Sequence, residues 1–306
     1  MNMTVEISRE KNRFGNCLRL ANNQVEVLAA IDYGPRIVSF KRINGENLLF
    51  EDTEGFILNN NPEIENAYGL GKVWHGKGGH RFWVAPEKMP FTYYPDDSLV
   101  SYEINGKILR FFQDPQVENG IQLIMELMLE EEAKIKVNHI VRNISCSSME
   151  IAPWAVTVMA GGGVEIIPRT LRQEEFLPNM NLVLWPYTDL NDDRISFDKE
   201  HIFLKQIKFD SNSTEKKGRL KIGISNEEGW VAYINKGQMF KKEFFFDRKG
   251  LYPDYGASYE TYTDDNIIEL ESLGCLEVLA PGEETNHEEI WTIHEIPNMF
   301  KKLGGK

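Results

Sequence analysis

Short runs in which apolar and polar residues alternate dominate the chain, and turn-forming residues separate them. Within one such run Ile135, Val137, His139 and Val141 alternate with polar neighbours, which is typical of a half-buried strand. No long segment has the periodicity of an amphipathic helix. The pattern predicts strands at Gln24–Ile31, Arg36–Lys41, Ser101–Asn105, Lys107–Phe112, Gln122–Leu129, Ala133–Arg142, Arg219–Ile224, Gly229–Ile234, Gln238–Phe246, Ala257–Tyr262, Asn266–Leu273 and His287–Ile293.

Strands at this spacing predict an all-β fold, either a sandwich or a barrel. No linker interrupts the pattern, so we expect residues 1–306 to form a single domain. Two long stretches, Gly55–Ser98 and Thr170–Asp198, are rich in Pro, Gly and Asn. We expect them to be irregular, and long ordered loops in a compact β-domain often carry function.

Composition narrows the classes of partner. The chain has 306 residues, 42% of them hydrophobic, and a formal net charge of -13. An acidic chain is poorly suited to the phosphate backbone of nucleic acids or to an anionic membrane surface. No run reaches the roughly 18 apolar residues of a membrane-spanning helix. We therefore expect no nucleic-acid partner and no membrane, and a small neutral ligand fits the charge.

The cysteines and the first residues suggest a compartment. Cys17, Cys146 and Cys275 are odd in number and far apart, so they form neither a disulfide framework nor a metal-binding spacing. Free thiols suit a reducing environment, and the polar opening segment has no apolar core of a signal peptide. The expectation is a cytoplasmic protein.

The segment from Trp74 to Trp83 (WHGKGGHRFW) is the densest cluster of side chains suited to sugar binding. It holds His75, His80 and Arg81 between two tryptophans. Apolar faces of sugars stack on aromatic rings, and their hydroxyls accept hydrogen bonds from Arg. The glycines allow a ligand to approach the backbone. The alternative is a structural loop with a core tryptophan and solvated cations.

Two later segments offer further aromatic side chains. Trp154 follows a proline and precedes the glycine triplet at 161–163, and Trp185 stands near Asp189 in the segment LWPYTDL. Each segment is consistent with a pocket wall and equally with core packing or loop anchoring. The glycine triplet is not a phosphate loop, because no Lys-Ser or Lys-Thr follows it.

The strand Ile267–Gly274 (IIELESLG) places two carboxylates on one face. Alternation puts Glu269 and Glu271 together, with Ile268 and Leu270 on the other face. Mutual repulsion between neighbouring carboxylates can raise the pKa of one of them toward neutrality, as a general base requires. In isolation, a solvated face is the simpler interpretation. His287, in the last predicted strand, is by default a structural histidine.

Metal binding and cofactors have little support. His75 and His80 are five residues apart in a glycine-rich segment, which matches no established ligand spacing. We therefore expect neither a metal nor a cofactor.

Three stretches resemble the galactose mutarotase-like superfamily, which includes aldose 1-epimerases. Gln24–Phe50 is similar to the first strands, Gly79–Glu87 (GHRFWVAPE) to an arginine-bearing loop that lines the sugar cleft, and Tyr259–Trp291 to the ending, with Leu270-Glu271 before a Pro-Gly-Glu turn. The blocks GGHRFWVAPE, APWAVTVM, LVLWPYTDL and IELESLG are most similar to a branch defined as a domain of unknown function. The resemblance implies a large antiparallel β-sandwich, or supersandwich, with an open sugar cleft.

The resemblance also implies a mechanism, in which a glutamate removes the proton of the anomeric hydroxyl and an acid protonates the ring oxygen. Glu271 matches the base. Trp154 stands where the family has the histidine that acts as the general acid. His80 is therefore the candidate acid, with His75 and His287 as alternatives. The residues expected to shape the cleft or to bind the sugar are Arg81, Trp83, His75, Trp154, Trp185, Asp189, Glu260, Glu269 and His287.

These arguments lead to one hypothesis with two alternatives. The first is a carbohydrate-binding protein that acts as an aldose 1-epimerase on a small-molecule sugar. The second is a sugar-binding or sensor module without catalysis. The third is another carbohydrate enzyme, a hydrolase or a lyase, that uses Glu271 with a second acid.

Overall fold

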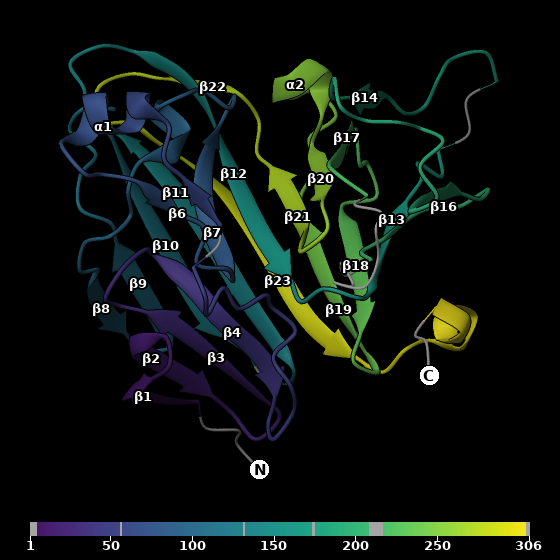
Figure 1. Ribbon diagram of the computed structural model, residues 1–306, viewed down its shortest axis with the longest axis horizontal. Coiled ribbons are helices and arrows are strands. Elements are labelled where there is room, and N and C mark those ends of the chain that lie inside the picture. Colours follow the sequence, from purple (N-terminus) through teal and green to yellow (C-terminus); the bar gives the residue numbers. More distant parts are fainter. Residues whose placement is uncertain (1–4, 56, 131, 173–174, 208–216, 304–306) are drawn as a thin grey trace.

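Two large antiparallel sheets pack face to face in the computed structural model, which describes residues 5–55, 57–130, 132–172, 175–207 and 217–303 (Figure 1). The strands of the first sheet run in the order β1-β2-β3-β4-β7-β12-β21-β20-β17-β14, and β22 pairs with one end of β12. Their bounds are β1 Glu6–Asn12, β2 Gly15–Ala21, β3 Val25–Ala30, β4 Arg36–Arg42, β7 His80–Ala85, β12 Met149–Met159, β14 Leu182–Leu184, β17 Leu220–Ile224, β20 Tyr259–Thr263, β21 Ile268–Leu273 and β22 Glu277–Leu279.

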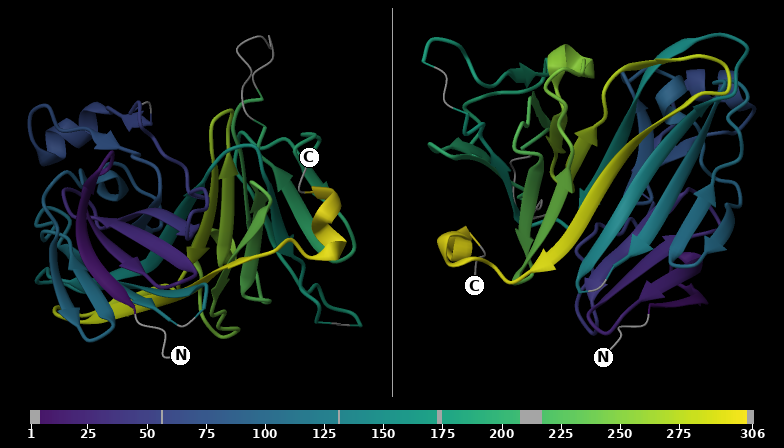
Figure 2. Two further views of the ribbon diagram at one scale, coloured as in Figure 1. Left: turned by 90° about the horizontal axis from the view of Figure 1, so that it is seen from below. Right: turned by 180° about the vertical axis from the view of Figure 1, so that it is seen from behind.

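The second sheet has the order β15-β16-β13-β18-β19-β23-β11-β10-β9-β8. Figure 2 shows β23 in yellow, crossing the molecule between β19 and β11. The bounds are β8 Ser101–Asn105, β9 Ile108–Phe112, β10 Ile121–Leu129, β11 Lys134–Asn143, β13 Val164–Pro168, β15 Ile195–Phe197, β16 His201–Lys205, β18 Trp230–Asn235, β19 Gln238–Phe244 and β23 Glu284–His294.

Helices are short, as the lack of helical periodicity predicts. A small ribbon of two strands and four helical turns complete the described elements. They are β5 Leu58–Asn59, β6 Trp74–His75, α1 Pro62–Tyr68, α2 Pro253–Gly256, and the 3-10 turns η1 Phe91–Tyr93 and η2 Asn298–Leu303. None of the helices in the described part of the chain has the length and apolarity needed to cross a bilayer.

The core lies between the two sheets, where most inward positions of both carry apolar side chains and a smaller set of buried polar groups accompanies them. Phe40 of the first sheet meets Trp291 and Phe240 of the second, with ring centroids 5.9 and 6.2 Å away. Alternation leaves the other face of the first sheet free to carry polar groups. The predicted all-β antiparallel sandwich is therefore confirmed.

The prediction that Gly55–Ser98 is irregular was wrong at its centre. Residues His80–Ala85 form β7, which pairs with β4 and β12 in the middle of the first sheet. The glycines and prolines that suggested a loop flank this strand without interrupting it. The strands β1, β2, β5, β6, β12, β13, β16 and β22 were also not predicted. The stretch Thr170–Asp198, which was expected to be irregular, contains the short strands β14 and β15. Pro153 of β12 lies between the parts of that strand that pair with β22 and β21.

Candidate functional site

A cavity of about 590 Å³ opens on the outward face of the first sheet, a volume in the usual range for small-ligand sites. Its floor is formed by adjacent strands β7, β12, β21, β20 and β17. The residues around it are mostly aromatic or charged: Ile57, Leu58, Trp74, Arg81, Trp83, Glu87, Tyr93, Trp154, Trp185, Tyr187, Arg219, Lys221, Tyr262, Asp264, Asn266, Ile267, Glu269 and Glu271.

Glu271 lies buried on the cavity floor and receives two hydrogen bonds on one oxygen. The indole Nε1 of Trp154 donates to its Oε2 at 3.0 Å, and Lys221 Nζ donates to the same atom at 2.9 Å. The other oxygen, Oε1, is buried and has no hydrogen-bond partner among the described residues. A buried carboxylate oxygen without a partner is costly, so a donor that reached this atom would form a favourable hydrogen bond.

Lys221 joins Glu271 to a second buried carboxylate. Its Nζ lies 2.7 Å from Oε2 of Glu260, on the neighbouring strand β20. Burial raises the pKa of Glu260 well above its usual value, and it also raises the pKa of Glu271, while Lys221 opposes both shifts. Burial by itself would lower the pKa of Lys221, but Glu271 and Glu260 outweigh it and raise that pKa.

The wall beside this group combines an ion pair with aromatic rings that pack edge-on or tilted against one another. Arg81 Nη1 donates to Oε1 of Glu269 at 2.9 Å, and the guanidinium lies 4.0 Å from the ring centroid of Trp83. Trp83 packs edge-on against Trp154 and tilted against Trp74, with centroids 5.4 and 5.0 Å apart. A cation and a carboxylate beside several ring faces form the kind of surface to which sugars bind.

Trp185 reaches the floor because of a glycine. A Cβ on Gly223 of β17 would lie 3.3 Å from Cζ3 of the Trp185 ring, so a larger residue here would displace the indole. The ring of Trp185 lies 4.8 Å from Nζ of Lys221, which is the same distance as that to the ring of Trp154. The two tryptophans therefore flank the ammonium group.

Six of the predicted site residues line this cavity. They are Glu271, Glu269, Arg81, Trp83, Trp154 and Trp185. Glu260 lies behind them, 1% exposed, and contacts the site through Lys221. The shared outward face of Glu269 and Glu271 follows from strand alternation, as the sequence predicts.

Four other predicted residues do not line the cavity. His75 lies on β6, and its carbonyl accepts a hydrogen bond from Arg36. Asp189 is exposed, and it accepts from the backbone of Asn191. His80, on β7 of the first sheet, and His287, on β23 of the second, are both buried between the two sheets.

The placement of His80 corrects its assignment as the acid. His80 and Arg81 are consecutive residues of β7, so their side chains lie on opposite faces of the sheet. Arg81 lines the cavity, and His80 is 0% exposed beneath it. Burial lowers the pKa of His80 well below its usual value. His80 therefore has no path to a ligand on the outer face.

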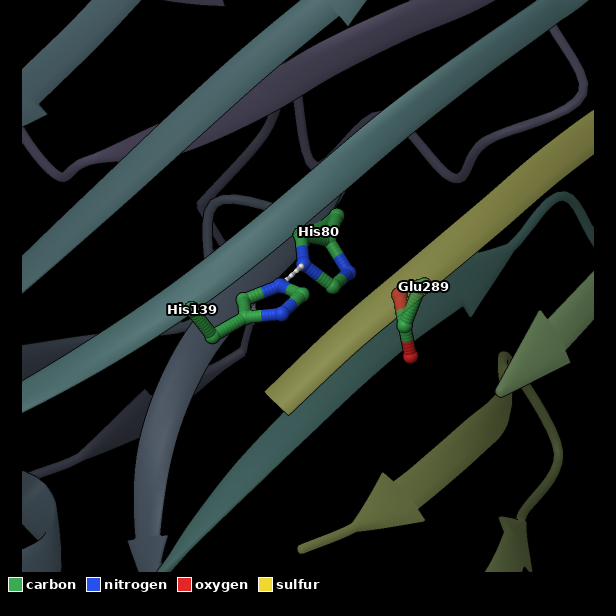
Figure 3. A group of neighbouring side chains, drawn as sticks. All are labelled: His80, His139 and Glu289. Atoms are coloured by element: carbon green, nitrogen blue, oxygen red, sulfur yellow. Dashed lines mark hydrogen bonds between the residues drawn. The ribbon is translucent and has the colours of Figure 1, made fainter. Parts of the chain in front are cut away.

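His80 belongs to a buried cluster with His139 and Glu289 (Figure 3). Their potential ligand atoms lie within 4.8 Å of one another, close enough to surround a metal ion. Hydrogen bonds already satisfy them, however. Thr157 hydroxyl and His80 Nδ1 are 2.9 Å apart, His80 Nε2 and His139 Nε2 are 2.7 Å apart, and His139 Nδ1 donates to the carbonyl of His287.

Glu289 is satisfied as well. Its Oε1 lies 2.8 Å from Nζ of Lys242, and its Oε2 accepts from the indole of Trp291 at 2.8 Å. Burial alone would raise the pKa of Glu289, but Lys242, His139 and His287 outweigh burial and lower it. An ammonium already neutralises this carboxylate, so the cluster fits a structural polar network better than a metal site.

Sequence reasoning missed Lys221, the residue that connects the two buried glutamates. The sequence pattern places Lys221 within the predicted strand Arg219–Ile224 but does not identify it as a site residue. A signal did exist in the sequence, because Lys221 stands between the apolar residues Leu220 and Ile222 in a short apolar run. In the structure the whole strand, including Lys221, is buried. A lysine in such a strand needs a buried partner. Arg219 of the cavity was also missed. Its guanidinium lies 4.5 Å from the ring of Tyr187, which belongs to the aromatic segment LWPYTDL.

A second cavity of about 890 Å³ lies on the first sheet above β3 and β4 and shares Asn266 with the first. Its charged side chains pair with one another, as Arg13 does with Glu51 and Lys41 with Glu26. It contains fewer aromatic side chains than the first cavity, so the first one is the stronger candidate site.

Comparison with solved structures identifies the fold. A "putative aldose 1-epimerase" from Klebsiella pneumoniae is similar over 100% of this chain and 89% of its own, at a TM-score of 0.61 and 10% identity. A galactose mutarotase-like protein from Lactobacillus casei is similar over 91% of this chain and 100% of its own, with a TM-score of 0.54 and 11% identity.

A TPR-domain containing protein from Parabacteroides distasonis is also similar, over 92% of this chain but only 47% of its own, with a TM-score of 0.58 and 13% identity. This chain thus spans about half of that protein. No protein-family model matches the chain, and no curated protein matches it either. Likeness at this identity establishes that the chain has the galactose mutarotase-like fold.

Proposed function

We propose, from the galactose mutarotase-like fold and the chemistry of its outward cavity, that this protein binds a sugar there. The rings of Trp83, Trp154 and Trp185 offer apolar faces for stacking against the sugar. Arg81, Glu269 and Glu271 offer donors and acceptors for hydroxyl groups. The cavity volume suits a sugar of one or two rings.

We further propose that the protein interconverts anomers, as an aldose 1-epimerase does. The observation that carries this proposal is the state of Glu271, a buried carboxylate on the cavity floor. Lys221 and Trp154 bind its Oε2 and fix its orientation. Its Oε1 remains to accept a proton. Burial raises the pKa of Glu271, which brings it closer to the range in which a carboxylate is an effective base.

In this reaction Glu271 takes the proton of the anomeric hydroxyl, and the bond between C1 and the ring oxygen breaks as the ring oxygen gains a proton. The open-chain aldehyde then rotates about the C1–C2 bond. Closure of the ring reverses both proton transfers and gives the other anomer. The similarity to the solved structures named above supports the fold on which this proposal rests. The residues of the cavity support the proposed chemistry.

A sugar-binding protein without catalysis is the second candidate. The observation that favours it is Trp154, which stands beside Glu271 where the resemblance expects an acidic histidine. The experiment below separates the two candidates.

Two NMR measurements test the proposal on a panel of free, N-acetylated and phosphorylated aldoses. Saturation-transfer spectra report binding, and exchange spectra between the two anomeric protons report interconversion. We expect at least one sugar to bind and its anomer exchange to accelerate. Glu271→Gln should keep binding and lose about 10²–10⁴-fold in exchange rate. The matched control Glu277→Gln, at an exposed position of β22, should retain both.

Each candidate can fail separately. Binding without faster exchange for any sugar would support the non-catalytic candidate. The absence of binding across the panel would contradict both.

A further inference from the structure

The cavity floor contains an ammonium group held between two carboxylates. Lys221 Nζ lies 2.9 Å from Oε2 of Glu271 and 2.7 Å from Oε2 of Glu260. All three side chains are buried or nearly so, with exposed fractions of 6% for Lys221 and 1% for each glutamate. Among the described residues that line the cavity, Lys221 is the only lysine.

The position of Lys221 next to Glu271, more than its charge, suits it to donate a proton in the proposed reaction. The anomeric hydroxyl oxygen and the ring oxygen of an aldose are both bonded to C1, so the groups that exchange protons with them must be close together. Lys221 and Glu271 are hydrogen-bonded neighbours on β17 and β21, separated only by β20. Trp154 and Trp185 flank the ammonium, and all three residues line the same cavity, so a sugar bound in this cavity would lie close to the ammonium.

We propose that Lys221 is the catalytic acid of this site and gives its proton to the ring oxygen of the bound sugar. This inference rests on the proposed epimerase function. In the ring-opening step the proton of the anomeric hydroxyl passes to Glu271 Oε1, and the electron pair of that O–H bond becomes the second bond of the aldehyde carbonyl. The bond from C1 to the ring oxygen breaks, and its electron pair takes a proton from Lys221.

After ring opening, Glu271 is a neutral carboxylic acid and Lys221 a neutral amine. Ring closure reverses the transfers. The ring hydroxyl returns its proton to the amine as its oxygen attacks C1, and the carbonyl oxygen takes the proton from Glu271. Both side chains thus return to their starting states, and no other reactant is consumed.

The contact between the two groups couples the two transfers. While Glu271 is charged, it stabilises the ammonium of Lys221 at 2.9 Å. When Glu271 accepts the anomeric proton, that stabilisation is lost, so Lys221 becomes a stronger acid at the moment its proton is needed. Glu260 does not take part in the proton transfers. It remains in contact with Nζ of Lys221 and holds the side chain of Lys221 in position.

The other candidate acids are less suitable. His80 and His287 lie between the two sheets, away from the cavity. Arg219 and Arg81 line the cavity, but a guanidinium does not release its proton in proteins. Glu269 is ion-paired with Arg81. Tyr187 lies in an irregular segment that no strand positions.

Lysine variants test the proposal with the exchange and binding measurements described above, on a sugar whose anomers the wild-type protein interconverts. Lys221→Met should lose about 10²–10⁴-fold in exchange rate and still bind the sugar. Lys241→Met is the matched control, because Lys241 is half-buried on the second sheet, where it pairs with Glu243. It should keep the wild-type rate.

Lys221→Arg separates proton donation from fixed charge. Arginine preserves the cation and its hydrogen bonds but not the transferable proton. We therefore expect Lys221→Arg to remain at least about 10²-fold slower than wild type. Recovery to within a few-fold of the wild-type rate would overturn the proposal, because the lysine would then act only as a cation. A wild-type rate in Lys221→Met would overturn it directly.

A folding defect has its own control. Removing Lys221 leaves two buried carboxylates unpaired, so Lys221→Met is also prepared with Glu260→Gln. The double variant should bind sugar and stay inactive, and an active double variant would contradict the role of Lys221. If the wild-type protein accelerates no exchange, the proposed function fails, which differs from a failure of Lys221 alone.

Discussion

Trp154 donates a 3.0 Å hydrogen bond from its indole nitrogen to Oε2 of Glu271, across the boundary between β12 and β21. The two residues come from segments of the chain that are 117 positions apart. The tryptophan therefore has two functions at the site, because its ring forms part of the aromatic wall and its N–H orients the carboxylate. The residue that stands where the resemblance places a histidine thus orients the carboxylate that is proposed as the base.

Trp154→Phe should separate these two functions. Phenylalanine keeps an aromatic face for the sugar but cannot donate to Glu271. A hydrogen bond to a charged group is worth about 1.5–3 kcal/mol, and its loss favours the neutral carboxyl and raises the pKa of Glu271 further. We expect sugar affinity to change little and the acidic limb of the exchange-rate profile to move to higher pH.

The control for this variant is Trp154→Ala, which removes both the ring and the donor. This variant should lower both the affinity for sugar, measured by calorimetry, and the rate of anomer exchange. A profile of Trp154→Phe that coincides with that of the wild-type protein would mean that the hydrogen bond has no influence on the base.

Strand alternation in the sequence was sufficient to place Glu269 and Glu271 on one face, and the structure has them on the cavity side. The same rule would have separated His80 from Arg81 had β7 been recognised as a strand. The glycines before it and the prolines after it indicated a loop, because local composition gave no sign of the pairing with β4 and β12. Residues 80–85 form a strand because they pair with distant segments of the chain, and the local sequence pattern does not reveal such pairing.

Lys221 shows another limit of the pattern. A lysine within an apolar strand requires a partner, but the partners Glu260 and Glu271 lie 39 and 50 positions later in the chain, on β20 and β21. Only the order of strands β21-β20-β17 brings them together. The sequence could therefore predict that this lysine is buried and paired, but not with which residues.

A second buried ion pair, between Lys242 and Glu289, should be important for stability. The ammonium and carboxylate are 2.8 Å apart and both are 0% exposed. Removing one partner of a buried pair typically costs about 3–5 kcal/mol. We expect Lys242→Met to lower the free energy of unfolding by that amount in urea denaturation.

The neighbouring position supplies a matched control. Lys241→Met removes a half-buried lysine on the opposite face of the same strand, where it pairs with Glu243. Partly exposed ion pairs contribute at most about 1 kcal/mol to stability, so the free energy of unfolding of this variant should be close to that of wild type. Equal losses for the two variants would show that the buried pair has no special role.

The cluster of His80, His139 and Glu289 should not depend on a metal. Its ring nitrogens and carboxylate oxygens already take part in hydrogen bonds, and Lys242 occupies the carboxylate. We expect neither zinc nor a chelator to change the midpoint of thermal unfolding. A rise of several degrees with zinc, lost in His139→Gln, would instead identify the cluster as a metal site.

Glu165 should make stability depend on pH. It lies on β13 of the second sheet, fully buried, and accepts hydrogen bonds from Tyr259 and, at 2.6 Å, from Thr261 of the first sheet. Burial raises the pKa of Glu165 to about 8. The folded protein therefore holds this proton between about pH 4.5 and 8, where the unfolded chain has released it.

Because the folded state binds more protons in that range, the contribution of Glu165 is largest at low pH and falls as pH rises toward 8. The slope is at most about 1.4 kcal/mol per pH unit. Glu165→Gln resembles the protonated carboxyl and removes this term, so its stability relative to wild type should increase from pH 5 to pH 9. Urea denaturation across this range measures the difference. For the control Glu200→Gln, at an exposed position, the free energy of unfolding should follow the same pH dependence as that of wild type. If Glu165→Gln also followed the wild-type pH dependence, the carboxyl of Glu165 would be ionised in the folded protein as in the unfolded chain.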